Sequence, residues 1–158
     1  MDVVALYNYM SLQMHAYALE SSLGYLATRF SRVIIRRINL ALAQAGLAIT
    51  TEQYSFLVQL WYCNGLPQGS LAERTAKDKT TIARLAAGLE TTGLIVRAPS
   101  TVDARERLVF LSDDGMKVME QATVLVRSIL DEAQQGIDEQ QLEICSSVLK
   151  QVYDNLLA

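Results

Sequence analysis

The chain has 158 residues, of which 51% are hydrophobic, and a formal net charge of −3. These values suit a single globular domain with its own core and exclude a largely disordered chain. The two cysteines, Cys63 and Cys145, lie far apart without metal-ligand spacing, which excludes a disulfide framework and fits a reducing, cytoplasmic compartment.

The first segment carries apolar side chains at helical spacing: Leu6, Met10, Met14 and Tyr17. Because Asp2 precedes this apolar run and no Lys or Arg does, we interpret it as an amphipathic helix rather than a signal peptide. No stretch of about 18 apolar residues occurs in the chain, so the sequence predicts no membrane span.

A long helix is predicted from about Glu20 to Ala45, ending at Gly46. Its apolar side chains recur at helical spacing: Leu23, Leu26, Phe30, Val33, Ile34, Ile38 and Ala41. Its other face carries Arg29, Arg32, Arg36 and Arg37.

Three shorter helices are predicted next. The first begins with the capping-box pattern Thr50-x-x-Gln53 and ends at Asn64-Gly65. The second follows Pro67 and covers roughly residues 68–76. The third has Asp78 as its N-cap and runs to Gly93.

Two strand-like runs follow, "LIVRA" (94–98) and "RLVFL" (107–111). The charged segment between them is too long for a tight hairpin, so we expect its tip to project outward. Ser112 is predicted to cap a helix that extends to about Gln135. Asp138 is predicted to cap the last helix, whose apolar stripe is Leu142, Cys145, Leu149, Val152, Tyr153 and Leu156.

This order of elements predicts a winged helix-turn-helix. Two closely spaced helices with a short turn, followed by a two-stranded ribbon, are typical of that fold. The predicted class is mainly α with a small two- or three-stranded antiparallel wing. Within one domain of residues 1–158, we assign 48–112 to the winged-helix core and 1–46 and 113–158 to dimerisation helices.

The helix after Asp78 has two distinct faces. Ile82, Leu85, Ala86 and Leu89 share one side and are predicted to be buried. The opposite side holds Thr80, Arg84 and Ala87, flanked by Thr81, Ala83 and Gly88. Small side chains, hydroxyls and an arginine suit close approach to base edges in a major groove. The alternative is a plain surface helix whose alanines only supply helix propensity.

The charge is unevenly distributed, and the excess of basic residues coincides with this region. Residues 65–111 contain seven basic and five acidic residues, whereas the remainder contains seven and twelve. A locally positive face can steer a polyanion even when the whole chain is acidic. Arg105 and Arg107 near the wing tip suit a minor groove, and Asp103 can orient Arg105. The alternative is a surface ion-pair cluster of little energetic value.

The segment "LAERTAKDKTTIARLAAGLETTGLIVRAPSTVDARERLVFLSDDG" resembles the winged-helix core of the MarR family of bacterial transcriptional regulators. The resemblance covers about residues 22–133. Its most specific part is Asp103-x-Arg105…Val109-x-Leu111-Ser112-x-x-Gly115 after Gly93-Leu94-Ile95, which follows the family's Asp-x-Arg…Leu-x-Leu-(Ser/Thr)-x-x-Gly string with valine at the first leucine. Three positions depart from the family pattern: Pro67 where a capping Ser or Thr is usual, Thr75 where an apolar residue is usual, and Ala76 where glycine is usual.

The resemblance implies binding to a double-stranded DNA operator. Thr80, Thr81 and Arg84 match the family's major-groove residues, with Lys79 beside them. Arg105 matches its minor-groove arginine and Asp103 the aspartate that positions it, with Arg107 close by.

The resemblance also implies a homodimer, an operator and an effector. The terminal helices carry a longer apolar surface than one winged helix can cover, so we expect a two-fold symmetric dimer. Its operator should be a pseudo-palindrome with half-sites about 10 bp apart. Repression is the expected outcome. Family members bind aromatic carboxylates in a crevice, which by position is lined here by Tyr25, Arg29, Arg32, Tyr54 and Trp61; the alternative is core aromatics and solvated arginines.

Other classes of protein fit the sequence less well. His15 is the only histidine, and no Gly-rich phosphate loop follows a strand, so we expect no enzyme, metal site or cofactor. A winged-helix module that binds protein, and a cysteine-based redox sensor, are the alternatives. The peroxide-sensing branch of the family uses an N-terminal cysteine, which this chain lacks, and we expect Cys63 and Cys145 to be buried in the packing.

Overall fold

The computed structural model of the chain describes residues 2–4, 19–100 and 106–157. The predictions made for Leu6, Met10, Met14, His15 and Tyr17, and those for Asp103 and Arg105, lie outside the described residues. From residue 19 on, the elements in chain order are η1 (Leu19–Ser21), α2 (Leu23–Gln44), α3 (Thr51–Tyr62), β1 (Leu66–Pro67), α4 (Gln68–Arg74), α5 (Lys79–Thr91), β2 (Ile95–Pro99), β3 (Arg107–Leu111), α6 (Asp113–Ala133) and α7 (Glu139–Leu157).

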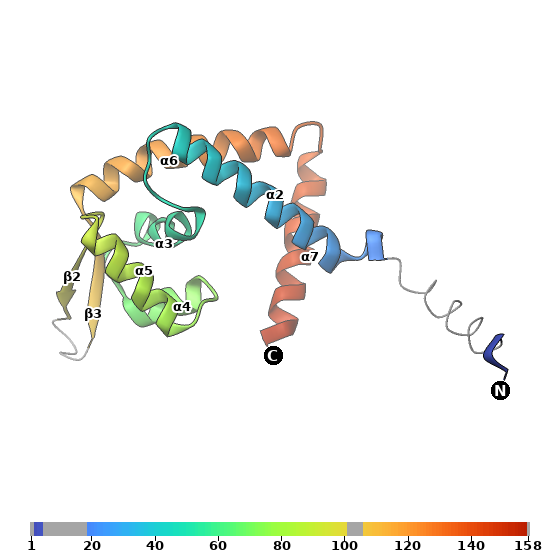
Figure 1. Ribbon diagram of the computed structural model, residues 1–158, viewed down its shortest axis with the longest axis horizontal. Coiled ribbons are helices and arrows are strands. Elements are labelled where there is room, and N and C mark those ends of the chain that lie inside the picture. Colours follow the sequence, from blue (N-terminus) through green and yellow to red (C-terminus); the bar gives the residue numbers. More distant parts are fainter. Residues whose placement is uncertain (1, 5–18, 101–105, 158) are drawn as a thin grey trace.

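The winged helix-turn-helix forms one lobe, and two long helices lie across it. Figure 1 shows α3, α4, α5 and the strands together below α2 and α6, while α7 descends away from this lobe. Helices α2 and α6 contact each other. The fold is therefore mainly helical with a small sheet, as the sequence predicts.

The sheet has three antiparallel strands in the order β1–β3–β2. Ile95 pairs with Leu111 at one end of the β2–β3 ribbon and Pro99 with Arg107 at the other. β1 adds only two residues, with Leu66 opposite Val109. β1 directly precedes α4 and pairs with β3 of the ribbon. The start of the helix-turn-helix is therefore joined to the wing through one sheet.

The predicted starts of α3 and α6 are confirmed by their caps. The Thr50 hydroxyl accepts the Gln53 N–H at 3.2 Å, and the Gln53 side chain accepts the Thr50 N–H at 2.9 Å, which completes the capping box. Ser112 accepts the Gly115 N–H at 2.9 Å at the start of α6. Pro67, which has no side-chain acceptor, precedes α4 without a side-chain cap.

The core lies between the winged lobe and the two long helices. Its largest fully buried side chains are Leu42, Phe56, Leu57, Leu60, Leu71, Ile82, Leu89, Ile95, Val109 and Met119. Burying one such side chain contributes about 1.5–3 kcal/mol. Elements from α2 to α6 all supply members, so the core holds the position of α5 relative to the ribbon.

Polar contacts fix α2 against its neighbours. The Asn39 amide oxygen on α2 accepts both the backbone N–H and the hydroxyl of Thr51, at 2.7 and 2.8 Å, at the start of α3. Arg37 on α2 donates two parallel hydrogen bonds, of 2.9 and 2.8 Å, to the Glu132 carboxylate on α6. The C-terminal half of α2 is thereby held against α3 of the lobe and against α6.

The first long helix differs from its prediction in two ways. It begins at Leu23 rather than about Glu20, because a 3-10 turn ends at Ser21 and Ser22 caps α2 by accepting the Tyr25 N–H. Of its apolar side chains only Ile38 and Leu42 are buried. The N-terminal half of α2 extends beyond the core, so its apolar face is open.

Much of the apolar surface of the terminal helices is exposed in the single chain. α7 has no buried residue. The exposed large apolar side chains of these two helices are Leu23, Leu26, Phe30, Val33, Ile35 and Leu40 on α2, and Ile144, Val148, Leu149, Val152, Tyr153, Leu156 and Leu157 on α7. Within the described ranges, no helix is both long enough and apolar enough to cross a membrane.

The expected burial of the two cysteines is wrong for the single chain, because both are exposed. α3 ends at Tyr62, and Cys63 continues in an extended conformation that takes it off the buried face of Phe56, Leu57 and Leu60. Cys145 lies on α7, which has no cover in one chain.

Candidate nucleic-acid interface

The turn before α5 is built by backbone hydrogen bonds and one strained residue. The Ala76 N–H donates to the Glu73 carbonyl at 3.2 Å, and the Lys77 N–H donates to the Ala72 carbonyl at 3.0 Å. Ala76 has a φ of 51°, in the left-handed region that favours glycine. Ala76, which stands where the family pattern has glycine, is therefore the residue of this turn whose backbone conformation favours glycine.

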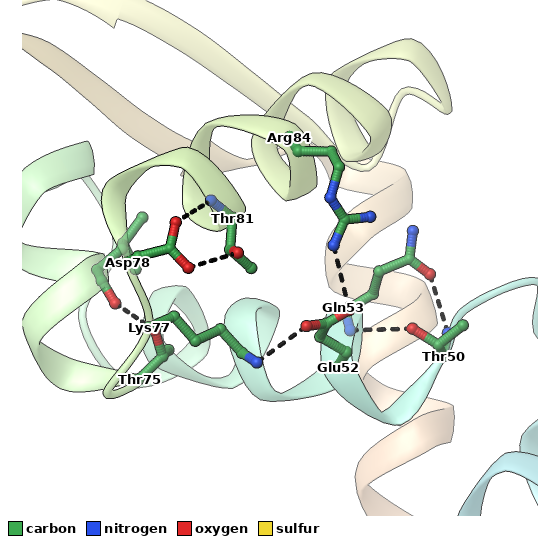
Figure 2. Close-up of polar contacts among 9 residues, drawn as sticks. Thr50, Glu52, Gln53, Thr75, Lys77, Asp78, Thr81 and Arg84 are labelled. Carbon is green, nitrogen blue, oxygen red and sulfur yellow. Dashed lines mark hydrogen bonds and ion pairs between the residues drawn. The ribbon is translucent and has the colours of Figure 1, made fainter.

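Asp78 caps α5 with both of its oxygens. One accepts the Thr81 N–H at 2.8 Å and the other accepts the Thr81 hydroxyl at 2.7 Å (Figure 2). These hydrogen bonds, the backbone one above all, hold the pKa of Asp78 below its ordinary value. The predicted N-cap is confirmed, and it fixes where the exposed face of α5 begins.

The two faces of α5 match their prediction. Ile82, Leu85, Ala86 and Leu89 are buried. The exposed face is formed by Lys79, Thr80, Ala83, Arg84, Ala87 and Gly88, and Thr81 is half-buried beside it. The exposed face of the helix therefore consists of small residues together with one lysine, one threonine and one arginine.

A carboxylate from α3 contacts this face. Glu52 accepts a hydrogen bond from the Lys77 ammonium at 2.9 Å, and its other oxygen lies 3.7 Å from the Arg84 guanidinium (Figure 2). The hydrogen bond from Lys77 is the main reason that the pKa of Glu52 lies below its ordinary value. Neither Glu52 nor Lys77 is predicted from the sequence to belong to this face, because an acid in the first turn of a helix has a sufficient local explanation.

A second ion pair joins α5 to the wing. The Arg97 Nε on β2 donates to the Glu90 carboxylate on α5 at 3.0 Å, and the Arg97 Nη2 donates to the same oxygen. This pairing lowers the pKa of Glu90, chiefly through the hydrogen bond. Helix α5 and the ribbon are thus linked by a charged contact as well as by the core.

The ribbon carries Arg107 at its outer end. Arg107 is exposed and pairs across the ribbon with Pro99. The Ser100 N–H donates to the Glu106 carbonyl at 3.0 Å, which extends the pairing by one step. Arg107 therefore lies at the outer end of the ribbon, where β3 begins after the wing tip, whose Asp103 and Arg105 are outside the described residues.

The predicted ligand residues are spread over α2 and α3. The Arg29 guanidinium lies 5.5 Å from the centre of the Tyr25 ring, so these two are together. Arg32 is exposed on α2, Tyr54 is half-buried against the core, and Trp61 is 37% exposed.

A pocket of about 440 Å³ lies elsewhere, at the end of α2 and the middle of α6. Its lining residues are Ala45, Glu120, Gln121, Val124 and Leu125. None of the five predicted ligand residues belongs to this lining.

Comparison with known proteins agrees with this geometry. The profile of the MarR family matches residues 49–106, the segment from the start of α3 to the edge of β3. The organic hydroperoxide resistance transcriptional regulator of Bacillus subtilis (strain 168) is 32% identical over 126 residues, which are 79% of this chain and 84% of that protein. The chain belongs to the MarR family. It is a transcriptional regulator with a DNA-binding fold.

Solved structures of MarR-type regulators share this fold. CouR from Rhodococcus jostii RHA1, bound to p-coumaroyl-CoA, is 26% identical with a TM-score of 0.67, covering 88% of this chain and 91% of its own. The transcriptional repressor CouR bound to a 23-mer DNA duplex is 24% identical with a TM-score of 0.77, covering 85% and 94%. The resemblance inferred from the sequence is therefore confirmed at the level of family and fold.

Proposed function

We propose that this MarR-family regulator binds a pseudo-palindromic operator as a homodimer and represses transcription until a small aromatic ligand releases it. The observation that carries this proposal is the open face of α5, where Thr80 and Arg84 are exposed among small residues. The helix itself packs against strand β2 of the ribbon (Figure 1). Such a face lets a helix approach base edges closely, and the ribbon adds a second contact beside it.

The exposed residues of α5 have two roles: one contacts a base edge, and the others contact phosphates. Arg84 is 69% exposed along its side chain and reads a guanine edge. Lys79 and Thr80 lie at the helix start, where cations and hydroxyls contact phosphate. Thr81 contributes mainly through its cap, since its hydroxyl proton is already donated to Asp78.

The wing supplies the second contact. Arg105 enters the minor groove, Asp103 orients its guanidinium, and Arg107 at the end of β3 neutralises a neighbouring phosphate. This assignment is supported by the position of Arg107 and by the family's pattern at residues 103 and 105.

The dimer is formed by the terminal helices, 1–46 and 113–158, around the winged core of 48–112. The unburied apolar side chains of α2 and α7 support this interface, because such surfaces in water associate. A CouR structure contains a DNA duplex, which supports the same use of the shared fold here. These roles place the protein in the cytoplasm with the chromosome.

The effector proposal is supported by CouR, whose structure holds p-coumaroyl-CoA. An aromatic carboxylate or phenolic ligand would meet Tyr25, Arg29, Arg32, Tyr54 and Trp61 in a crevice between the dimer helices and the winged lobe. A thermal-shift screen of phenolic acids, followed by a gel shift with each stabilising compound, tests this step. A compound that raises the melting temperature should also release DNA.

The redox alternative gains support from two observations: Cys63 is exposed, and a similar protein is an organic hydroperoxide resistance transcriptional regulator. We expect hydroperoxide to leave DNA binding unchanged. Loss of binding in the unmodified protein, but not in Cys63→Ser or Cys145→Ser, would establish the alternative.

The DNA-binding proposal is tested by a gel shift on the DNA upstream of the protein's own gene. We expect a retarded complex containing two protomers, competed by the same duplex but not by a scrambled one. Arg84→Ala should relax base preference, and Arg107→Ala should weaken binding evenly across sequences. A complex that is insensitive to salt would contradict an interface built on phosphate contacts.

A further inference from the structure

Glu52 lies on α3, outside the predicted DNA face, yet its carboxylate reaches two cations of the helix-turn-helix. Figure 2 shows Lys77 and Arg84 approaching it from the turn and from the exposed face of α5. A first-turn acid also interacts favourably with the helix dipole, and that role alone would leave DNA binding untouched. The contacts with Lys77 and Arg84 indicate that Glu52 also acts on the exposed face of α5.

The two contacts differ in kind. The Lys77 ammonium is hydrogen-bonded to Glu52 at 2.9 Å, and the Lys77 side chain is only 28% exposed. The Arg84 guanidinium is 3.7 Å away and 69% exposed. A separation of 3.7 Å exceeds hydrogen-bond length, so Arg84 and Glu52 form an ion pair without a hydrogen bond. Lys77 therefore belongs to the scaffold, whereas Arg84 can exchange its partner.

We propose that Glu52 is a positioning residue that sets the DNA selectivity of α5 by holding the Arg84 guanidinium until a base edge replaces it. This inference rests on the proposed function, because it concerns the residue assigned to base reading. When Arg84 leaves, Glu52 keeps its hydrogen bond to Lys77, so the carboxylate is not left unpaired. The exchange is therefore possible without breaking the turn.

The exchange affects the affinity for operator DNA and the affinity for non-specific DNA to different extents. A guanine offers Arg84 two acceptors in a fixed geometry, which compensates for loss of the Glu52 contact. A lone phosphate on unrelated DNA compensates less, and Glu52 also repels it. Glu52 thus weakens non-specific binding more than specific binding.

Glu52→Gln isolates this effect. The glutamine oxygen can still accept the Lys77 hydrogen bond, while the negative charge beside Arg84 is lost. Glu73→Gln is the matched control, because Glu73 is exposed on the neighbouring helix α4 and its loss changes the net charge equally. Melting temperatures of all variants report whether the fold is kept.

The experiment measures dissociation constants for two duplexes across a range of salt. One duplex is selected by the unmodified protein from a random-sequence library, and the other is a scrambled version of it. We expect Glu52→Gln to tighten binding to the scrambled duplex by about tenfold and to the selected duplex much less. Its salt dependence on scrambled DNA should steepen by about 0.9 in the log–log slope, as for one added cation.

The Arg84→Ala background decides whether the effect passes through Arg84. There, Glu52→Gln should change the ratio of the two affinities by less than about twofold, within the usual limit of additivity. An equal change in both backgrounds, no change in the unmodified background, or the same change from Glu73→Gln would each overturn the inference. A protein that binds neither duplex would overturn the proposed function itself, so the two failures are distinguishable.

Discussion

The Asp78 carboxylate accepts both the backbone N–H and the hydroxyl proton of Thr81, at 2.8 and 2.7 Å. Two adjacent threonines at the start of α5 therefore differ in what they can offer DNA. Thr80 is exposed, whereas the only hydroxyl proton of Thr81 is already donated within the protein. The sequence placed both in the same role, and the structure separates them.

We predict that Thr80→Val weakens operator binding by about threefold to tenfold, the value of one hydrogen bond. Thr81→Val should change binding by less than about threefold and instead lower the free energy of unfolding by about 0.5–1 kcal/mol through the cap. Gel-shift titration and urea unfolding of both variants check this pair. Equal losses of affinity would show that Thr81 leaves its cap in the complex.

Ala76→Gly should stabilise the protein. An L-residue in the left-handed region costs about 1–2 kcal/mol, and glycine removes that cost but adds about 0.5–1 kcal/mol of chain entropy. We expect a net gain of about 0.5–1 kcal/mol in the free energy of unfolding, measured by urea denaturation. A loss of stability would mean that the Ala76 methyl group packs favourably at the turn.

Gly115→Ala should be strongly destabilising. A Cβ at this position would lie 2.0 Å from the carbonyl oxygen of Leu94, the residue before β2, so the first turn of α6 would have to move away from this backbone. We expect a loss of about 2–3 kcal/mol, as for an overpacked core. Gly88→Ala is the control, because Gly88 lies on the exposed face of α5 and its Cβ would meet nothing within 4 Å; this variant should gain about 0.5–1 kcal/mol.

The bond between Arg37 and Glu132 should make stability fall in acid. The hydrogen bond from Arg37, and then its charge, lower the pKa of Glu132 in the folded state. A lowered folded-state pKa gives a contribution that is present above the unfolded value and is lost as the pH falls through the folded value. Because the pair is exposed, salt screens it and the effect is small.

The measurement for this pair is urea unfolding between neutral pH and about pH 3, below the ordinary glutamate pKa of about 4.3. The unmodified protein should lose more stability over this range than Glu132→Gln does. Glu120→Gln, on the exposed face of the same helix, serves as the control. Parallel pH profiles for all three proteins would contradict a contribution from this pair.

Most of the fold could be predicted from sequence patterns that act over a few neighbouring residues. The Thr50–Gln53 capping box, Asp78 and Ser112 each act within a few residues, so the sequence alone specifies where α3, α5 and α6 begin. The buried stripe of α5 follows from helical periodicity in the same way. These features depend on near neighbours, which a sequence displays directly.

Features that depend on distant partners were missed. β1 is only two residues long and exists because Leu66 pairs with Val109, so it has no pattern of its own. Glu52 meets Arg84 only after α3 and α5 pack together. Cys63 was expected inside because its neighbours are apolar, but its exposure follows from where α3 ends.

The most direct test of the account is hydroxyl-radical footprinting of the unmodified protein and Arg84→Ala on the DNA upstream of its own gene. We predict two protected regions related by a dyad, with centres about 10 bp apart, one for each recognition helix. With Arg84→Ala, the protection should become weak and spread along the duplex. No protection by the unmodified protein, or an identical pattern from both proteins, would contradict the claim that the open face of α5 reads DNA.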